Sequence, residues 1–514
     1  MLAKAYSAAI IGVDAYTVEI EINSTESGEQ NFVSIVGLPD AAVKESKERV
    51  RSALQSSGLM HPYGIVVINL APADIKKEGA GFDLPIALLM TAVTGKINRT
   101  MLSESMIAGE LALDGSVRPV KGVLPMAVHA KNMGRIKNII VPTANAAEAA
   151  IAAGNIPVYP VDNLRDAVAL LSGKGGIFPF QKTLEEATDA SEKLSIPDFA
   201  EVKGQACAKR ALMIAAAGAH NVMMIGPPGT GKSMLARRVP GILPPMHIDE
   251  ALETSRIHSI MGILPLGIPL VTHRPFRAPH HTISDAGLLG GQSIPTPGEI
   301  SLSHNGVLFL DELPEFKRNV LEVLRQPLES GSVTVSRAAG SFTFPARFML
   351  IAAMNPCPCG HYGNMQRVCR CNPPQIQRYR SKISGPLLDR IDIHVEMSPL
   401  GDEELLAIPK GERSCEIRKK VSTARKIQEE RLGSKGVYCN SQMQAAELQH
   451  FCELDSQSRN FLKHSIRELQ LSARAYDRIL RVARTIADLE GAERISQEFL
   501  CEAVQYRGLD KKLW

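Results

Sequence analysis

The fold is decided by one stretch of the chain, Val222-Met-Met-Ile225 followed directly by Gly226-Pro-Pro-Gly229-Thr-Gly231-Lys232-Ser233. The apolar run predicts a buried strand, and the glycine-rich segment predicts a turn into a helix over 233–239. Glycines there let backbone N–H groups surround phosphates, while Lys232 reaches the β and γ oxygens and the Ser233 hydroxyl holds Mg²⁺. The stretch therefore predicts a P-loop α/β domain that binds ATP and Mg²⁺. The expected nucleotide-binding residues are Gly226, Pro227, Pro228, Gly229, Thr230, Gly231, Lys232 and Ser233.

Two apolar runs downstream end in the polar side chains that a P-loop ATPase requires. The run 307–310 is followed by Asp311, which would hold Mg²⁺, and by Glu312, which would polarise the attacking water. The run 348–353 is followed by Asn355, whose side chain could sense the γ-phosphate and hold the water. Asn355 before a proline is equally a good turn residue, so both interpretations stay open.

Two arginines complete the predicted catalytic set, because guanidinium groups stabilise charge that builds on the γ-phosphoryl oxygens. Arg390, in Gly385-Pro-Leu-Leu-Asp-Arg390-Ile-Asp392, is the expected finger that acts on the nucleotide of a neighbouring subunit. This role requires a ring of subunits. Arg474 lies at the start of a predicted helix and could reach the nucleotide of its own chain, although arginines are common in such helices.

Composition excludes several classes of protein. The chain has 514 residues with 45% hydrophobic content, which is ample for packed cores and excludes a disordered or fibrous chain. Lys plus Arg number 58 and Asp plus Glu 54, so any nucleic-acid surface must be local. No stretch approaches the roughly 18 consecutive apolar residues of a membrane span, and we expect a cytoplasmic protein with no membrane partner.

The pattern along the chain predicts an α/β multidomain architecture. Short strands alternate with helices over 1–171, and a glycine-containing segment without periodicity, 172–196, is the expected linker. The P-loop domain is expected over 197–398. Region 399–514 has helical periodicity and almost no strand signal, so we expect a C-terminal helical lid.

Two segments are candidates for contact with DNA phosphates, which demand positive charge but no reading of bases. About 80 residues separate Lys232 from Asp311, more than a minimal helix and strand require, so an insertion is expected there. Alternating runs over 332–345 predict a β-hairpin with Arg337 near its tip, which is either a pore loop or a structural hairpin. The DNA-binding candidates are Arg274, Arg277, His280, His281 and Arg337.

Four of the nine cysteines crowd together as Cys357-Pro-Cys359 and Cys369-Arg-Cys371. Their thiolates could gather a tetrahedral Zn²⁺, but common zinc sites place two or more residues between paired ligands. Structural zinc, free or redox-active thiols and an iron–sulfur cluster therefore remain alternatives.

These motifs resemble AAA+ ATPases of the magnesium-chelatase type, and the entire chain resembles the ComM/YifB family of bacteria. The resemblance implies a helix-2 insert, Walker B, sensor 1 and arginine-finger segments, with Arg474 at the sensor 2 position and a hairpin before sensor 1. It also implies a homo-hexameric DNA helicase that acts on single-stranded and branched DNA during integration of transforming DNA, with recombination proteins as further partners. The segments that carry it are 274–281, 297–312, 355–360 and 385–390.

The N-terminal region is similar to the Lon-protease C-terminal domain, which has a ribosomal-S5-like α+β fold. The Lon pattern places its nucleophilic serine where Gly81 follows Lys77-Glu78-Gly79-Ala80, and the position of its catalytic lysine falls at about Leu124. A hydroxyl nucleophile needs an adjacent base, so we expect a protease-like domain without proteolysis. A rival hypothesis for the whole chain is a protein remodeller or a chelatase-like chaperone, which DNA-independent ATP turnover would favour.

Overall fold

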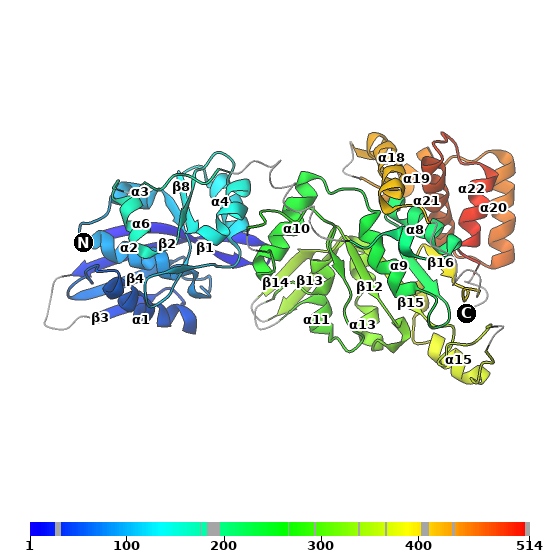
Figure 1. The fold of residues 1–514 in the computed structure, drawn as a ribbon, viewed down its shortest axis with the longest axis horizontal. Helices are drawn as coiled ribbons and strands as arrows, with labels where there is room; N and C mark the ends of the chain where they lie inside the picture. The colour runs from blue at the N-terminus through cyan, green and yellow to red at the C-terminus, as the bar shows by residue number, and fades with distance from the viewer. Residues whose placement is uncertain are drawn as a thin grey trace. The chain divides into compact units, whose positions relative to one another are not determined.

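The computed structural model describes residues 1–25, 32–174, 176–181, 196–265, 267–291, 295–337, 340–364, 367–401, 411–433 and 437–508. Most of the predicted linker lies outside these residues. The chain divides into two compact units, the first formed by Met1–Lys193 with Ile248–Thr272 and the second by Leu194–His247 with His273–Trp514. The colours of Figure 1 follow the chain through both units.

The first unit is built on a mixed seven-stranded sheet in the order β3-β4-β2-β1-β5-β8-β9. Strand β2 pairs antiparallel with both β1 and β4. Its alternating residues Val18, Ile20 and Ile22 are buried, so this apolar face of the strand packs into the core. The strands are β1 (Leu2–Ile11), β2 (Asp14–Thr25), β3 (Phe32–Val36), β4 (Ile65–Ala71), β5 (Ser105–Ile107), β8 (Asn138–Pro142) and β9 (Val158–Val161).

Six helices of the first unit are α1 (Ala41–Ser56), α2 (Asp83–Val93), α4 (Val123–Met133), α5 (Ala146–Ala153), α6 (Leu164–Leu171) and α10 (Ile248–Met261). Helix α10 comes from the predicted insertion, yet it packs with α4 in the first unit. Its Ser259 hydroxyl donates to Glu148 Oε2 at 2.7 Å. Burial raises the pKa of Glu148, although its hydrogen bonds to Ser259 and Asn145 oppose that effect.

The second unit contains a parallel five-stranded sheet in the order β11-β12-β15-β10-β16. Every residue of β10, β12 and β15 is buried, so these strands are continuous apolar runs. Helices α8 (Ala206–Gly218) and α9 (Lys232–Arg238) flank β10 in sequence. The strands are β10 (Val222–Ile225), β11 (Phe276–Arg277), β12 (Val307–Leu310), β15 (Met349–Met354) and β16 (Ile393–Glu396).

The predicted hairpin is confirmed as β13 (Ser332–Arg337) paired antiparallel with β14 (Gly340–Pro345). The C-terminal region is helical where it is described, and Figure 1 shows α18 to α22 gathered in orange and red. Its helices are α18 (Ser414–Leu432), α19 (Ala445–Phe451), α20 (Ser456–Leu469), α21 (Ala473–Leu489) and α22 (Gln497–Gln505).

The mixed α/β architecture with a helical C-terminal region is confirmed, whereas the likeness of the N-terminal region to Lon protease stays a prediction. Helix α21 buries one apolar face, formed by Ile479, Val482, Ala483 and Ile486. Within the described part of the chain, no helix is both long and apolar enough to cross a membrane.

Candidate functional site

The predicted nucleotide-binding side chains follow three neighbouring parallel strands. Strand β15 lies between β10 and β12, with Ile225 opposite Met354 and Leu310 opposite Ala352. The carboxyl ends of parallel strands meet at one edge of a sheet, so the segments after these three strands converge there. The strand order thus brings together residues that are up to 130 positions apart in the sequence.

The P-loop turns sharply between β10 and α9. Gly229 and Gly231 have φ angles of +83° and +89°, which favour glycine because a side chain would be strained there. Gly226 needs a glycine for another reason, since a side-chain carbon would lie 2.5 Å from the carbonyl oxygen of Met397. The Thr230 hydroxyl closes the turn by donating to the carbonyl of Pro227 at 3.0 Å.

Lys232 begins α9 and its ammonium group points back into the loop. Its Nζ donates to the carbonyls of Gly226 (2.6 Å) and Pro227 (2.9 Å) and to Asn355 Oδ1 (3.2 Å). Burial lowers the pKa of Lys232 to about 8, although the carboxylates of Asp311 and Glu312 oppose this effect. The ammonium is therefore a desolvated cation held by neutral oxygens, which a phosphate oxygen could replace.

The predicted magnesium ligands contact each other. The Ser233 hydroxyl donates to Asp311 Oδ2 at 2.5 Å, and the other carboxylate oxygen accepts the backbone N–H of Glu312 at 2.9 Å. A hydroxyl and a carboxylate beside the lysine of a P-loop are the donors that Mg²⁺ uses in such sites. The residues present thus fit ATP with Mg²⁺.

Glu312 occupies a left-handed backbone conformation with a φ of +51°. A non-glycine residue at positive φ is uncommon and is often found at functional sites. Its carboxylate is half exposed and lies 3.6 Å from Nδ1 of His281. His281, predicted as a contact for DNA, is therefore the neighbour of the predicted catalytic glutamate.

The two predicted catalytic arginines share a different neighbour, Glu329. Arg390 Nη2 lies 2.5 Å from Glu329 Oε2, and its Nη1 donates to the carbonyl of Pro386 at 2.7 Å. Arg390 holds the pKa of Glu329 below its usual value, with smaller contributions from the charges of Arg474 and Arg478. Arg390 therefore pairs with this carboxylate, and nothing in the spacing of the sequence predicted Glu329 as its partner.

The loop that carries Arg390 is tied to the start of β10. The Asn221 side chain donates to the Arg390 carbonyl at 3.0 Å, and its backbone N–H donates to Asp392 Oδ2 at 2.9 Å. Burial would raise the pKa of Asp392, but Arg478 and His220 outweigh it and hold the pKa well below its usual range. The backbone of the predicted finger is thus held against Asn221, the residue that precedes β10.

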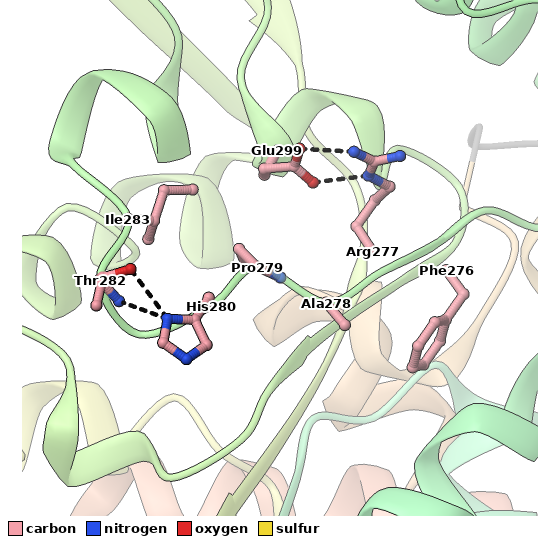
Figure 2. Close-up of a pocket in the computed structure, with 8 residues that line it drawn as sticks. All are labelled: Phe276, Arg277, Ala278, Pro279, His280, Thr282, Ile283 and Glu299. Atoms are coloured by element: carbon pink, nitrogen blue, oxygen red, sulfur yellow. Dashed lines mark hydrogen bonds and ion pairs between the residues drawn. The ribbon is translucent and has the colours of Figure 1, made fainter.

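Besides His281, three of the predicted DNA-binding residues have local partners. Arg274 donates to the carbonyls of Pro244 and Asn305, at 2.7 and 2.8 Å. Arg277 forms a bidentate pair with Glu299, with both distances 2.6 Å. Figure 2 shows this pair beside an open pocket of about 430 Å³, in which His280 faces Thr282.

Arg337 ends strand β13, opposite Gly340, and is exposed. Its guanidinium packs near the backbone of Gly291, and the two residues of the turn lie outside the described residues. Assignment of DNA binding to Arg337, and to the four residues of the insertion, stays a prediction.

The structure brings the four crowded cysteines together. The ligand atoms of Cys357, Cys359, Cys369 and Cys371 all lie within 4.8 Å of one another, and all four are free thiols. The group could hold a metal ion. It begins two residues after Asn355, next to the nucleotide-binding residues.

The positions compared with the Lon catalytic pair carry neither a hydroxyl nor an amine. Gly81 lies in a short 3₁₀ turn, Ala80–Phe82, and Leu124 is fully buried in α4. The nearby Asp83 is buried and paired with Arg49 at 2.7 Å. These side chains favour a structural role over nucleophilic catalysis.

Comparisons with known proteins match all parts of the chain. The family model described as Magnesium chelatase, subunit ChlI, matches residues 198–405. Subunit ChlI of Mg-chelatase matches residues 18–145, and Magnesium chelatase, subunit ChlI C-terminal, matches residues 411–507. The three models follow one another along the sequence and cover both structural units.

Two relatives are similar over the full length. The chain is 45% identical over 514 residues to competence protein ComM of Haemophilus influenzae, covering 100% of this chain and 98% of that protein. It is 44% identical to the uncharacterized protein YifB of Salmonella typhimurium, with the same coverage. A magnesium-chelatase subunit ChlI of Pyropia yezoensis is 28% identical over 210 residues, which are 36% of this chain and 52% of that protein.

Proposed function

The chain belongs to the ComM/YifB family of magnesium-chelatase-like AAA+ proteins, and from this membership we propose that it is an ATP-hydrolysing hexameric ring motor that moves on DNA. Its proposed activity is that of a helicase that promotes branch migration while transforming DNA is integrated. The name of the Haemophilus relative, a competence protein, supports this direction. Recombination proteins are the proposed further partners.

ATP hydrolysis is supported by one observation above the others, the joint placement of Lys232, Ser233, Asp311 and Asn355. Lys232 would bind the β and γ oxygens, and Ser233 with Asp311 would hold Mg²⁺, which neutralises phosphate charge when it is bound. Glu312 would orient and polarise the attacking water. Asn355, already hydrogen-bonded to Lys232, would hold that water beside the γ-phosphate.

The ring is supported by the pairing of Arg390 with Glu329. In the isolated chain the carboxylate of Glu329 pairs with the guanidinium group of Arg390, which would otherwise be available to bind a phosphate. We propose that assembly replaces Glu329 by the γ-phosphate of a neighbouring subunit. The charge of Arg474 also lowers the pKa of Glu329, although less than that of Arg390 does. For Arg474 we keep the expected role, in which it reaches the nucleotide of its own chain from the lid.

DNA as the substrate is supported by the exposed arginine of the hairpin β13–β14 and by the identity to a competence protein. A backbone-tracking loop needs positive charge and tolerates any sequence, so Arg337 suits it. The matches to magnesium-chelatase models keep one alternative, a remodeller or chaperone that acts on a protein client.

The test is ATP turnover by the full-length protein with and without single-stranded, duplex and branched DNA, at two salt concentrations. Salt-sensitive stimulation, greatest on branched or single-stranded DNA, is expected because phosphate contacts release counterions. Lys232→Ala should abolish turnover, and Arg237→Ala, an exposed residue on the same helix, is the matched control. Turnover that ignores every DNA would favour the protein-client alternative.

A further inference from the structure

Two cysteine pairs bracket the loop that follows the predicted sensor residue. Cys357 and Cys359 lie just after β15, and Cys369 and Cys371 lie just before α15 (Pro373–Arg380). The two pairs lie close together in space, although nine residues separate Cys359 from Cys369 in the sequence. Residues 365 and 366 of this loop are not among those described.

The sulfur atoms have the spacing of ligands around one ion. The Sγ of Cys357 lies 3.4 Å from that of Cys359 and 3.7 Å from that of Cys369, and Cys359 and Cys369 are 3.6 Å apart. With zinc–sulfur bonds of about 2.3 Å, a tetrahedron places its sulfur atoms about 3.8 Å apart. An iron–sulfur cluster spreads its thiolates over several irons and needs a wider group.

Backbone donors support charged sulfur atoms at this place. The N–H of Tyr362 donates to Cys357 Sγ at 3.3 Å, and the N–H of Cys371 donates to Cys369 Sγ at 3.4 Å. Such donors stabilise thiolates, which are the form of cysteine that binds metal. Both donors belong to the loop that carries the cysteines, so the loop backbone itself supports the charge of the sulfur atoms.

We propose that Cys357, Cys359, Cys369 and Cys371 bind one structural Zn²⁺, and that this ion braces the nucleotide site through the neighbouring segments 356–364 and 367–372. Four cysteine ligands close the coordination shell, so the ion has no open position for catalysis. Its contribution is to hold backbone in place. The proposal does not depend on DNA being the substrate.

The loop packs directly on the P-loop. Gly360 has a φ of +81°, and a side-chain carbon on it would lie 2.6 Å from Cδ of Pro228. The buried Arg380 of α15 donates to the carbonyl of Pro356 at 3.1 and 3.2 Å, and its guanidinium lies 5.1 Å from the ring centre of Tyr362. Zinc would fix the loop between these two anchors.

Asn355 immediately precedes this braced loop and reaches Lys232 with its side chain. If the four thiols were released, the backbone after Asn355 would gain freedom, and nucleotide binding would have to restrict it again. We therefore expect loss of zinc to weaken nucleotide binding about tenfold or more. The same loss should leave the first unit unaffected, because the four cysteines of the cluster all belong to the second unit.

The experiment measures zinc by mass spectrometry, thiol reactivity and affinity for a fluorescent ATP analogue, all on the full-length protein. Wild type should carry about one equivalent of zinc and protect four thiols until a chelator removes the metal. The double variant Cys369→Ser, Cys371→Ser should lose zinc and bind nucleotide more weakly. Cys415→Ser, at an exposed free cysteine of α18, is the matched control and should behave as wild type.

A second variant guards against simple misfolding. Cys371→His keeps a possible zinc ligand and should retain the metal and the nucleotide affinity, whereas chelator-treated wild type should reproduce the double variant. Less than about half an equivalent of zinc with four reactive thiols would overturn the site, as would bound iron in its place. Nucleotide affinity that survives loss of the metal would overturn the bracing role.

Discussion

The two halves of the predicted catalytic set behave differently within one chain. Around the P-loop, Lys232 reaches Asn355 and Ser233 reaches Asp311, so these groups find the partners that the chemistry requires. Arg390 instead pairs with Glu329, a carboxylate of its own chain, and Arg474 adds its charge there. One chain thus organises the phosphate site by itself, whereas Arg390 meets a carboxylate of its own chain, which fits its proposed action on a neighbouring subunit.

Removal of the predicted arginine finger should have the strongest effect on ATP turnover. Arg390→Ala should still assemble but lose ATP turnover by about 10³-fold or more, because arginine fingers contribute on this scale. An exposed arginine at the start of α13 (Arg318–Glu322), changed by Arg318→Ala, is the control. Steady-state ATP hydrolysis on rings of confirmed size measures the effect.

Rings that mix two inactive variants test whether Arg390 acts on the nucleotide of a neighbouring subunit. Arg390→Ala and Lys232→Ala subunits are each inactive, but a mixed ring contains junctions with an intact lysine on one side and an intact arginine on the other. Random mixing should restore about a quarter of the sites if the arginine acts on a neighbour. No recovery in rings proven to be mixed would place Arg390 and Lys232 at one nucleotide.

The next prediction concerns Glu312, the predicted catalytic glutamate beside the P-loop. Glu312→Gln should bind ATP normally but hydrolyse it about 10²- to 10⁴-fold more slowly, because an amide cannot accept the proton of the attacking water. Single-turnover hydrolysis together with nucleotide binding separates the two steps. Glu315→Gln, an exposed neighbour paired with Lys382, should change neither quantity.

A smaller effect follows from the lowered pKa of Lys232. Its folded pKa of about 8 lies below the usual 10.5, so the buried amine loses its charge as pH rises through 8. Because phosphate binds the charged form, affinity for an ATP analogue should fall above pH 8, by up to about tenfold per pH unit. Affinities measured between pH 7 and 9 should show this slope in wild type and a flat profile in Lys232→Ala.

Protein stability should change with pH in the opposite sense. The unfolded chain binds more protons at Lys232 between pH 8 and 10.5, so the cost of burying its charge is present at low pH and is relieved as pH rises.

A wild-type profile of nucleotide affinity that stayed flat to pH 9 would mean that the lysine keeps its charge despite burial.

The smallest effect concerns the carboxylate that restrains the finger. Glu329→Gln should release Arg390 and lower, by about fivefold at most, the protein concentration needed for half-maximal turnover, because an exposed ion pair contributes roughly 0–1 kcal/mol. Glu322→Gln, which alters a separate pair with Arg325, is the matched control. A higher concentration requirement in Glu329→Gln would show that this carboxylate supports assembly instead.

Much of the local structure followed from short sequence patterns. The strand 222–225 and the hairpin 332–345 were predicted from an apolar run and from alternating residues, and both patterns lie within a few consecutive residues. The insertion was expected from its length, but its helix α10 packs with the first unit, which no periodicity indicates. Amphipathic patterns identify an apolar face without naming the surface that will cover it.

The P-loop, the acidic pair Asp311 and Glu312 and the two cysteine pairs were predictable from short segments, because each motif lies within a few consecutive residues. Which charged side chains pair with each other depended on the folded chain. It placed His281 beside Glu312 and Glu329 beside Arg390, pairs that are 31 and 61 positions apart in the sequence. Electrostatic interactions depend on distance in space, and that distance is set by the order of strands in the sheet and by how the connecting segments fold back.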